Sequence, residues 1–315
     1  MKKSLIALAV LAASGAAMAQ SSVTLYGIAD VVIHKDKGAS AALASGGVSG
    51  SRLGFKGTED LGGGLKANFV LEQGLQLDTG AIGDGTAKTA GQAFSRQSYV
   101  GLSGGFGEVK LGKMWTAYDD IAGATNPVFD SVLAPTRIWV SSGYADNPAN
   151  GLYYATPDFG GISGAVSTTL KEGTGNQSTA FHAKYEGGPV FAGFAYQIDK
   201  VGAAETKFTR VNGSYDLGMA KLLAGYGLVK KTVGADVTDF TIGADVPLAA
   251  NIVLSAGYAS SKADGGARAN SYGLGVAYVL SKRTTVYGGL RNDNAVATAA
   301  GGVDSRYGVG VKHTF

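Results

Sequence analysis

Apolar and polar residues alternate along most of this chain with a period of two, which puts successive side chains on opposite faces of a β-strand. In the segment that begins at Val23, the apolar residues Val23 and Leu25 share one face and Thr24 lies on the other. The segment from Tyr272 to Tyr278 likewise has one apolar face with a tyrosine at each end. Such segments recur at short intervals, so the pattern predicts an all-β protein whose strands each have one polar face.

Two kinds of connection take turns between the predicted strands. The short ones are residues 59–64, 104–107, 157–161, 187–189, 217–219, 247–251 and 281–283. The longer, polar ones lie near residues 35–50, 78–93, 171–177, 199–205, 231–236, 262–268 and 292–302. Short turns on one side and long loops on the other are typical of membrane barrels, and counting strands between them gives about sixteen, an even number. The predicted fold is therefore a 16-stranded antiparallel transmembrane β-barrel, and this segmentation leaves all six prolines outside the strands.

The composition supports a membrane barrel and gives no indication of a macromolecular partner. Charged residues make up 16% of the 315 residues, below the roughly 25% that is usual in soluble domains. No apolar run beyond the N-terminus approaches the roughly 18 residues of a spanning helix. The mature chain would hold 25 basic residues (27 minus Lys2 and Lys3) against 24 acidic ones. This near balance gives no support for nucleic-acid binding.

Residues 1–19 have the pattern of a secretory signal peptide. Lys2 and Lys3 supply a positive start, an apolar core follows, and Ala17 and Ala19 form a small-residue cleavage site. The predicted division is therefore a signal peptide at residues 1–19 and a barrel at residues 20–315. N-terminal sequencing of the envelope protein should return Gln20; recovery of Met1 would contradict export by cleavage.

The last residues of the sequence form another alternating segment. Tyr307, Val309, Val311 and Phe315 share its apolar face. We expect this strand to pair with the one that begins at Val23, because closure of a barrel removes its sheet edges.

One connection, residues 114–149, is far longer than the others and lacks sustained alternation. It holds both tryptophans, Trp115 and Trp139, and half of the prolines. Structureless loops longer than about 15 residues are uncommon and usually functional. The apolar residues that an exposed loop would not need are Trp115, Ile121, Val128, Phe129, Val132, Leu133 and Trp139. We therefore expect this loop to fold inward and narrow the lumen.

Strand parity assigns a set of basic residues to the inside of the barrel. They are Arg52, Lys56, Lys66, Arg96 and Lys110. A lysine or arginine facing lipid at the membrane midplane costs about 2 to 4 kcal/mol, so these side chains must face the lumen. Barrels of 16 to 18 strands leave an aqueous channel. The architecture thus predicts passive diffusion of ions and small hydrophilic solutes.

Several segments resemble the general porins of Gram-negative bacteria, in particular their β-proteobacterial branch. They are residues 51–64 (SRLGFKGTEDLGGG), 95–107 (SRQSYVGLSGGFG), 150–161 (NGLYYATPDFGG) and 308–315 (GVGVKHTF). The resemblance implies a homotrimer in the outer membrane lipid, pores constricted by the third external loop, and a final Phe315 read by the barrel-assembly machinery. It also implies that Arg52 and Arg96 are wall arginines.

In the same pattern, the carboxylates of the constriction loop are matched by Asp119, Asp120 and Asp130. Relatives often carry a further acid where this chain has Asn126, which puts a strong cation preference in doubt. The small residues Gly27 and Ala29 of the first strand would allow a neighbouring barrel to approach closely.

Two other classes of function are weighed against a pore. Gly101 to Gly105 matches the G-x-S-x-G motif of hydrolases, but a β-strand follows it where that motif needs a helix, so a hairpin turn is favoured. The three histidines are too dispersed for a metal site. No catalytic residue, metal or cofactor is predicted. The remaining alternatives are a barrel with a plugged lumen, structural or adhesive, and a barrel enzyme.

Ion preference depends on position, because the charges of the first five strands and the long loop are balanced in number. The seven basic residues are Arg52, Lys56, Lys66, Arg96, Lys110, Lys113 and Arg137, and the seven acidic ones are Asp30, Glu72, Glu108, Asp119, Asp120, Asp130 and Asp146. Parity places Arg52 and Arg96 on the wall, and Arg137 lies in the inward loop. We predict weak anion selectivity carried by these three arginines.

Overall fold

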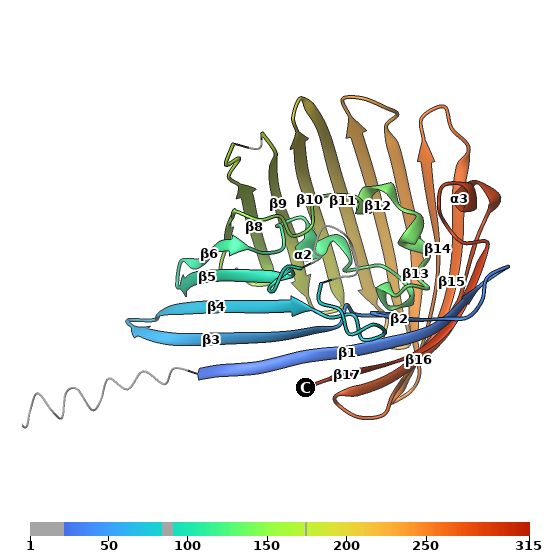
Figure 1. Ribbon diagram of the computed structural model, residues 1–315, viewed down its shortest axis with the longest axis horizontal. Coiled ribbons are helices and arrows are strands. Elements are labelled where there is room, and N and C mark those ends of the chain that lie inside the picture. Colours follow the sequence, from blue (N-terminus) through green and yellow to red (C-terminus); the bar gives the residue numbers. More distant parts are fainter. Residues whose placement is uncertain (1–21, 84–90, 174) are drawn as a thin grey trace, which may run out of the picture.

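The computed structural model describes residues 22–83, 91–173 and 175–315, which form a closed antiparallel barrel of sixteen strands (Figure 1). The barrel strands are β1 (Ser22–Asp36), β3 (Arg52–Gly62), β4 (Leu65–Gly74), β5 (Gln97–Gly104), β6 (Gly107–Lys113), β7 (Gly151–Ala155), β8 (Ile162–Thr169), β9 (Gln177–Gly187), β10 (Val190–Val201), β11 (Ala204–Asp216), β12 (Lys221–Lys231), β13 (Val237–Ala249), β14 (Ile252–Ala263), β15 (Arg268–Val279), β16 (Thr284–Asp293) and β17 (Ser305–Thr314). The predicted fold class is confirmed. The predicted signal peptide lies outside the described residues.

The barrel closes where β1 pairs with β3 along one edge and with β17 along the other. The register runs from Ser22 opposite Thr58 on β3 and from Ile28 opposite Thr314 on β17. A short strand in the first external loop, β2 (Ala42–Ser45), continues the pairing along residues Val31 to His34 of β1. Every barrel strand thus has a neighbour on both sides, which satisfies its backbone groups in lipid.

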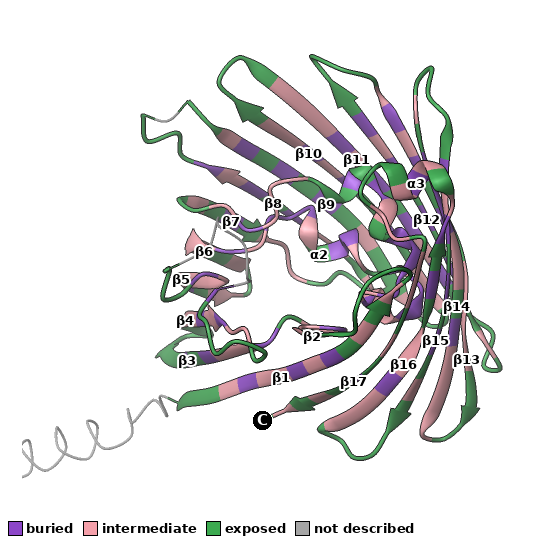
Figure 2. Cartoon of the chain, turned by 45° about the vertical axis from the view of Figure 1, so that its right-hand side comes forward, coloured by how far each residue is buried: buried purple, intermediate pink, exposed green. Residues whose placement is uncertain are grey.

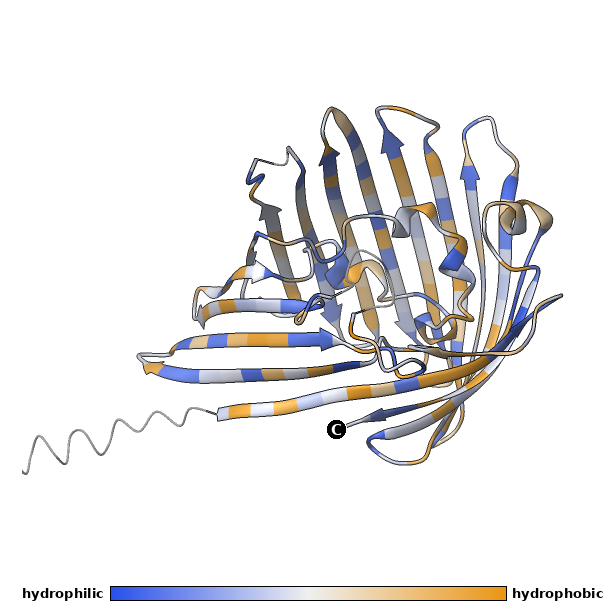
Figure 3. Cartoon of the chain, viewed as in Figure 1, coloured by the Kyte–Doolittle hydropathy of each residue, from blue (hydrophilic) through white to orange (hydrophobic). Residues whose placement is uncertain are grey.

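The two faces of the wall follow the alternation seen in the sequence. On β15, Tyr272, Leu274, Val276 and Tyr278 are exposed on the outer surface, whereas the intervening Gly273 and Gly275 face the inserted loop. Figure 2 shows buried and exposed residues taking turns along the strands, and Figure 3 shows the same for hydropathy. No helix in the described part of the chain is long and apolar enough to cross a membrane.

Three predicted connections are wrong in detail. The strand β3 continues to Gly62, so the first turn is shorter than residues 59–64. Residues 199–205 are not a long loop, because β10 and β11 continue to a turn at residues 202–203. Pro247 lies inside β13, next to a register shift between Pro247 and Ala249. Such an irregularity tolerates a residue that cannot donate to the ladder.

The residue after β17 packs against β1. Phe315 exchanges both backbone hydrogen bonds with Gly27, at 3.0 and 3.1 Å, and a Cβ on Gly27 would lie 2.3 Å from the Phe315 ring. The interpretation that Gly27 makes room for a neighbouring barrel is therefore replaced, since its missing side chain makes room for Phe315. Outward exposure is shared by Tyr307, Val309, Val311 and Phe315.

Replacing Phe315 with aspartate should reduce the amount of assembled barrel in the outer membrane. The change removes the aromatic cover of Gly27 and puts a charge on the outward face beside the closing seam, which is costly in lipid. Heat-modifiable migration in unheated samples measures the folded fraction. A matched control is Thr314→Asp, one residue earlier on the opposite face. Equal folded fractions in the wild type and the Phe315 variant would contradict the prediction.

Candidate functional site

The loop of residues 114–149 lies inside the barrel, as Figures 1 and 2 show at helix α2. It contains four short helical turns, namely α2 (Asp119–Ala122), η1 (Val128–Asp130), η2 (Pro135–Ile138) and η3 (Val140–Ser142). The turn α2 contacts β9 to β11, η3 contacts β11 to β13, and η1 and η2 contact β14 and β15. The inserted loop thus follows the inner wall over about half of its circumference and narrows the lumen from that side.

Apolar side chains attach the inserted loop to the wall. Ile121, Val128, Leu133 and Trp139 are each 5% exposed or less, and burial of each such side chain is worth about 1.5 to 3 kcal/mol. The part of the wall that faces the inserted loop contains glycines, which leave space for it. At Gly257, for example, a Cβ would lie 2.3 Å from Pro127. The predicted inward fold is thus explained by apolar residues on the loop and by glycines on distant strands.

Trp115 behaves differently from the other apolar residues of the inserted loop. It is only partly buried, and the guanidinium carbon of Arg96 lies 5.0 Å from its ring centre. A stacked arginine of this kind is held by the π-face without losing its charge. Trp115 therefore helps to fix a wall arginine.

A buried arginine clamps the turn η3 to the wall. Arg210, on β11, is 1% exposed and donates to the Ser141 carbonyl and hydroxyl at 3.3 Å. Its guanidinium lies 4.4 Å from the centre of the Trp139 ring. From β13, Asp239 accepts the Ser141 N–H at 2.6 Å. Two strands therefore hold one short segment of the loop through opposite charges.

The first wall arginines share one buried carboxylate. The Nε of Arg96 donates to Glu72 at 2.8 Å, and an Arg52 nitrogen lies 3.9 Å from the same oxygen. Tyr26 donates its hydroxyl to the other oxygen of Glu72 at 2.9 Å. Glu72 is 2% exposed. Two arginines against one carboxylate leave a net charge of +1 at this part of the wall.

The predicted lumen lysines differ in how far they are neutralised. Lys110 pairs with Glu108 at 3.0 Å and also lies over the rings of Tyr99 and Tyr153. The Nζ of Lys56 lies 5.2 Å from the centre of the Tyr26 ring, and Lys56 forms no ion pair with another residue in the described ranges. Lys66 is exposed and shares its strand face with Glu72. Lys110 contributes little net charge, whereas Lys56 adds to the positive wall.

The three predicted constriction-loop carboxylates lie on α2 and η1, and each is hydrogen-bonded. Asp119 accepts the Tyr144 hydroxyl at 2.6 Å, and Asp120 accepts the Tyr153 hydroxyl at 2.7 Å. Asp130 accepts the side-chain amide of Asn126 at 2.9 Å. The amide that departs from the family pattern thus binds a loop acid instead of adding one.

Burial gives Asp119 an unusual protonation equilibrium. Desolvation raises the pKa of Asp119 to about 7, and the nearby Asp146, Asp120 and Asp130 act in the same direction, although the Tyr144 hydroxyl opposes the shift. An aspartate with a pKa near 7 is only partly charged at neutral pH. The acidic side of the lumen is therefore weaker than a count of carboxylates indicates.

Arg137 carries an uncompensated charge on the inserted loop. It is exposed, and it donates to the backbone carbonyls of Ser131 at 2.9 Å and Asp130 at 2.6 Å. Backbone carbonyls orient the guanidinium but do not neutralise it. Among the described residues, no carboxylate forms an ion pair with Arg137.

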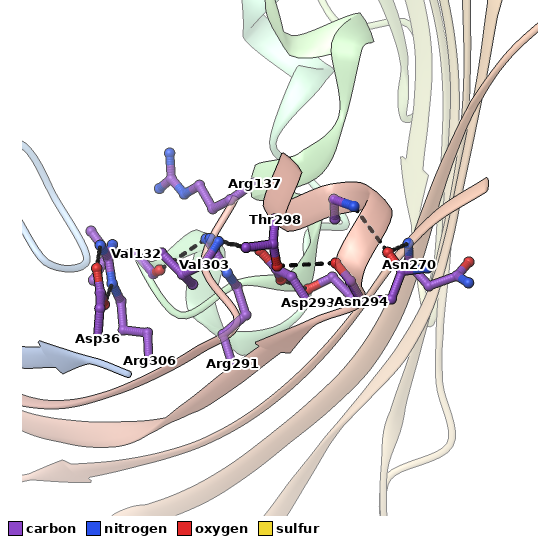
Figure 4. A network of polar contacts seen from close by, with 12 residues as sticks. Asp36, Val132, Arg137, Asn270, Arg291, Asp293, Asn294, Thr298, Val303 and Arg306 are labelled. Carbon is purple, nitrogen blue, oxygen red and sulfur yellow. Dashed lines mark hydrogen bonds and ion pairs between the residues drawn. The ribbon is translucent and has the colours of Figure 1, made fainter. Parts of the chain in front are cut away.

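Two further arginines, which are not among the predicted site residues, lie near Arg137 (Figure 4). Arg306 binds Asp36 through two hydrogen bonds of 2.6 and 2.7 Å, and Arg291 pairs with Asp293 at 3.1 Å. Arg291 also donates to the Val132 carbonyl of the inserted loop at 3.4 Å. Both are paired and position the wall and the loop, which leaves Arg137 as the exposed cation of this group.

The G-x-S-x-G match and the histidines, which were considered as signs of an enzyme or a metal site, can now be placed in the structure. Gly101 to Gly104 end β5, and β6 begins at Gly107, so the G-x-S-x-G match lies in a β-hairpin. Ser103 accepts the Asn68 amide there at 2.8 Å. Within residues 22–83, 91–173 and 175–315, no three metal-binding side chains are grouped together.

Comparison with known proteins assigns the family. A model of the Gram-negative porin family matches residues 5–298. The outer membrane porin protein 32 of Delftia acidovorans is 38% identical over the whole of both chains. The major outer membrane protein P.IB of Neisseria meningitidis serogroup A is 31% identical, again over both whole chains.

Solved structures agree with that assignment. The anion-selective porin from Comamonas acidovorans superposes with a TM-score of 0.79 at 30% identity, covering 94% of this chain and 100% of that chain. The OmpT loop L8 deletion mutant of Vibrio cholerae gives a TM-score of 0.74 at 18% identity, covering 94% of this chain and 99% of that one, and so shares the fold. The relatives from Delftia acidovorans and Comamonas acidovorans are porins, which are channels rather than enzymes. This chain therefore belongs to the family of Gram-negative porins and is an outer membrane porin.

Proposed function

We propose that this porin forms a trimer of weakly anion-selective pores, without catalytic activity of its own, for passive diffusion of ions and small hydrophilic solutes. The observation that carries the proposal is the charge balance at the inserted loop. Arg137 has no ion pair in the described ranges, and Arg52 and Arg96 share the single carboxylate of Glu72. Opposing them, Asp119 has a pKa raised to about 7. The similar Comamonas acidovorans porin is described as anion-selective, which agrees with this balance.

Planar-bilayer recording tests the channel itself. We expect discrete conductance steps, grouped in threes as the resemblance to trimeric general porins implies. Silence from correctly folded protein would favour the alternative of a plugged structural or adhesive barrel. Steps that occur only singly, together with monomeric migration of unheated protein, would contradict the trimer but not the pore.

Export and assembly are part of the same proposal. We infer that residues 1–19 are removed during export and that the barrel-assembly machinery recognises the terminal strand through Tyr307, Val309, Val311 and Phe315. The support is the signal-like sequence and the outward exposure of those four side chains. Crosslinking of the terminal strand to the assembly machinery in cells, lost in the Phe315 variant, is the expected result.

Changing both Arg52 and Arg96 to glutamine should shift the reversal potential of the pore toward cations. A unit charge about 5 Å from a passing ion is worth roughly 0.8 kcal/mol in water before screening by salt, so the change is expected to be a fewfold effect on the permeability ratio. Both amides retain hydrogen-bonding capacity toward Glu72. Reversal potentials in a salt gradient provide the measurement. The matched control is Lys282→Gln with Arg283→Gln, in a short turn outside the constriction; an equal shift there would defeat the assignment.

Anion preference should also increase as the pH falls through about 7, the pKa to which burial raises Asp119. Protonation of an acid removes negative charge, so the lumen becomes more positive below this pH and less positive above it. The Asp119→Asn variant should keep the low-pH selectivity throughout. Reversal potentials measured on both sides of neutrality check this. The control variant is His182→Asn, which removes the imidazole beside Asp120 and should leave the pH dependence in place. Persistence of the pH dependence in Asp119→Asn would contradict the role of Asp119.

A further inference from the structure

The outer wall of strands β11 to β15 contains an apolar hollow. Small outward residues, Gly213, Ala224 and Ala256, form its floor, and its volume is about 890 Å³. Larger outward side chains surround the floor: Tyr215, Leu222, Ile242, Tyr258, Tyr272 and Leu274. We call this feature the outer hollow. Its walls face away from the lumen, because the alternate residues Gly257 and Gly273 lie against the inserted loop.

The hollow follows from the register of the strands. Gly213 is opposite Ala224, and one row nearer the short turns Ala244 is opposite Ala256. Small residues therefore occur side by side on neighbouring strands, which lowers the surface over four strands at once. A membrane barrel in this position has only lipid, or another protein, to fill the depression.

Basic side chains lie above the hollow, at the external ends of the same strands. Lys262 on β14 is directly opposite Arg268 on β15, and Lys230 on β12 is opposite Lys207 on β11. Like charges directly opposite each other destabilise a sheet. All four alternate in parity with lumen-facing residues and therefore point outward, where an anionic group could offset their repulsion.

Most of this charge is not neutralised within the described chain. Lys207 pairs with Glu205 at 3.1 Å. The Arg268 guanidinium donates to the Ser260 hydroxyl at 3.0 Å, and among the residues described neither it nor Lys230 nor Lys262 forms an ion pair. In the adjoining loops, Asp236 bonds to the Lys231 backbone. Three cations, from Lys230, Lys262 and Arg268, therefore remain for an external partner.

The distance between the cations and the hollow matches a lipid. Tyr272 lies four positions along β15 from Arg268, and at about 3.4 Å per residue with a strand tilt near 40°, this is roughly 10 Å along the membrane normal. An acyl chain in the hollow would thus carry its headgroup at the level of the cations. The hollow and the three cations lie on the same strands, which Figure 1 shows side by side.

We propose that the outer hollow and the cations above it form one binding site for a phosphorylated lipid of the outer leaflet. One phosphate lies between Lys262 and Arg268, and an acyl chain fills the space over Ala224 and Ala256. Lys230, two strands from Lys262 and two residues farther toward the external end, lies about 12 Å away and suits a second phosphate on the same headgroup. The proposal depends on the outer membrane location and not on the ion selectivity.

The test uses folded protein in detergent, with native mass spectrometry counting retained lipid. The probes are diphosphorylated lipid A and, as the comparison with zero net charge, the zwitterion phosphatidylethanolamine. Wild type should retain lipid A in preference. Lys262→Gln with Arg268→Gln should weaken retention by about tenfold or more, as expected for losing two cations at a membrane surface. Ala256→Leu, which fills the hollow, should weaken retention of both lipids.

The matched control is Lys282→Gln with Arg283→Gln, which removes two cations from a short turn at the other end of the barrel. It should leave lipid A retention unchanged. Heat-modifiable migration and single-channel conductance establish that each variant is folded. Equal retention of lipid A and phosphatidylethanolamine by wild type, or an equal loss in the control, would overturn the site. A change of oligomeric state in Ala256→Leu without loss of lipid would overturn it in favour of a second copy of this chain.

Discussion

Replacing Gly257 with leucine should lower single-channel conductance to about half or less, because the tightly packed inner wall has no space for another side chain. A Cβ at this position would lie 2.3 Å from Cγ of Pro127 and 2.5 Å from its Cβ. The proline ring cannot rotate out of the way, since it is bonded to its own backbone. The inserted loop must therefore move away from the wall, and the only space available is the lumen.

The matched control is Ala256→Leu, the neighbouring residue on the opposite face of β14. The same side chain is added one position away, but it points to lipid and should leave conductance unchanged. Planar-bilayer recording of both variants, with folding checked by heat-modifiable migration, compares the two faces directly. Equal conductance in the two variants would show that the loop does not rest on this wall. Loss of folding in Gly257→Leu alone is addressed by the smaller Gly257→Ala, which should reduce conductance to a lesser extent.

The barrel could be predicted from the sequence because its determinants are local. Period-two alternation, glycine-rich turns and the parity of Arg52 are each visible within about ten residues. The errors are also local. Proline favours a turn, whereas the irregularity that lets Pro247 lie in β13 depends on the pairing of β13 with Val253 and its neighbours in β14, which the local sequence does not show. Residues 199–205 contain enough polar residues for a loop, but cross-strand pairing extends both strands through them.

The inward fold of the long loop was predictable, whereas its path was not. Apolar residues such as Leu133 and Trp139 indicate that the loop is buried, but the wall that receives them is built from glycines far along the chain. A glycine can occur in a strand for many reasons. Only the contacts with Pro127 and Leu133 show that these glycines make room for the inserted loop. Strand parity alone could have assigned Arg210 and Arg291 to the lumen, since each lies within an alternating strand.

Net charge at the pore required the three-dimensional structure for a different reason. Strand parity places both Arg52 and Glu72 inside the barrel. That Arg52 and Arg96 share the Glu72 carboxylate depends on strand register and on the position of Arg96, which lies at the end of a loop. The titration of Asp119 depends on burial by segments distant in sequence. Sequence can therefore enumerate the charges of a lumen, whereas pairing decides which of them a passing ion meets.

Changing Arg210 to leucine should release the turn η3 and make the open-channel current noisy. The substitution removes the hydrogen bonds to Ser141 and the cation–π contact with Trp139, together worth roughly 2 to 4 kcal/mol at this buried place. It also leaves Asp239 without the nearby positive charge that lowers the cost of its burial. The apolar contacts of Val128 and Leu133 remain, so the rest of the loop should stay on the wall.

Two measurements distinguish local release from general loss of structure. Current variance in the open state should rise several-fold over wild type, while heat-modifiable migration shows that the barrel is still folded. In a Trp115→Phe background, which leaves Trp139 as the remaining tryptophan, emission should shift to the red as Trp139 becomes hydrated. Arg283→Leu, which removes an exposed arginine from a short turn, should change neither signal. A quiet channel with unshifted emission in Arg210→Leu would show that apolar packing alone holds η3, because the buried cation would then contribute nothing to the position of the loop.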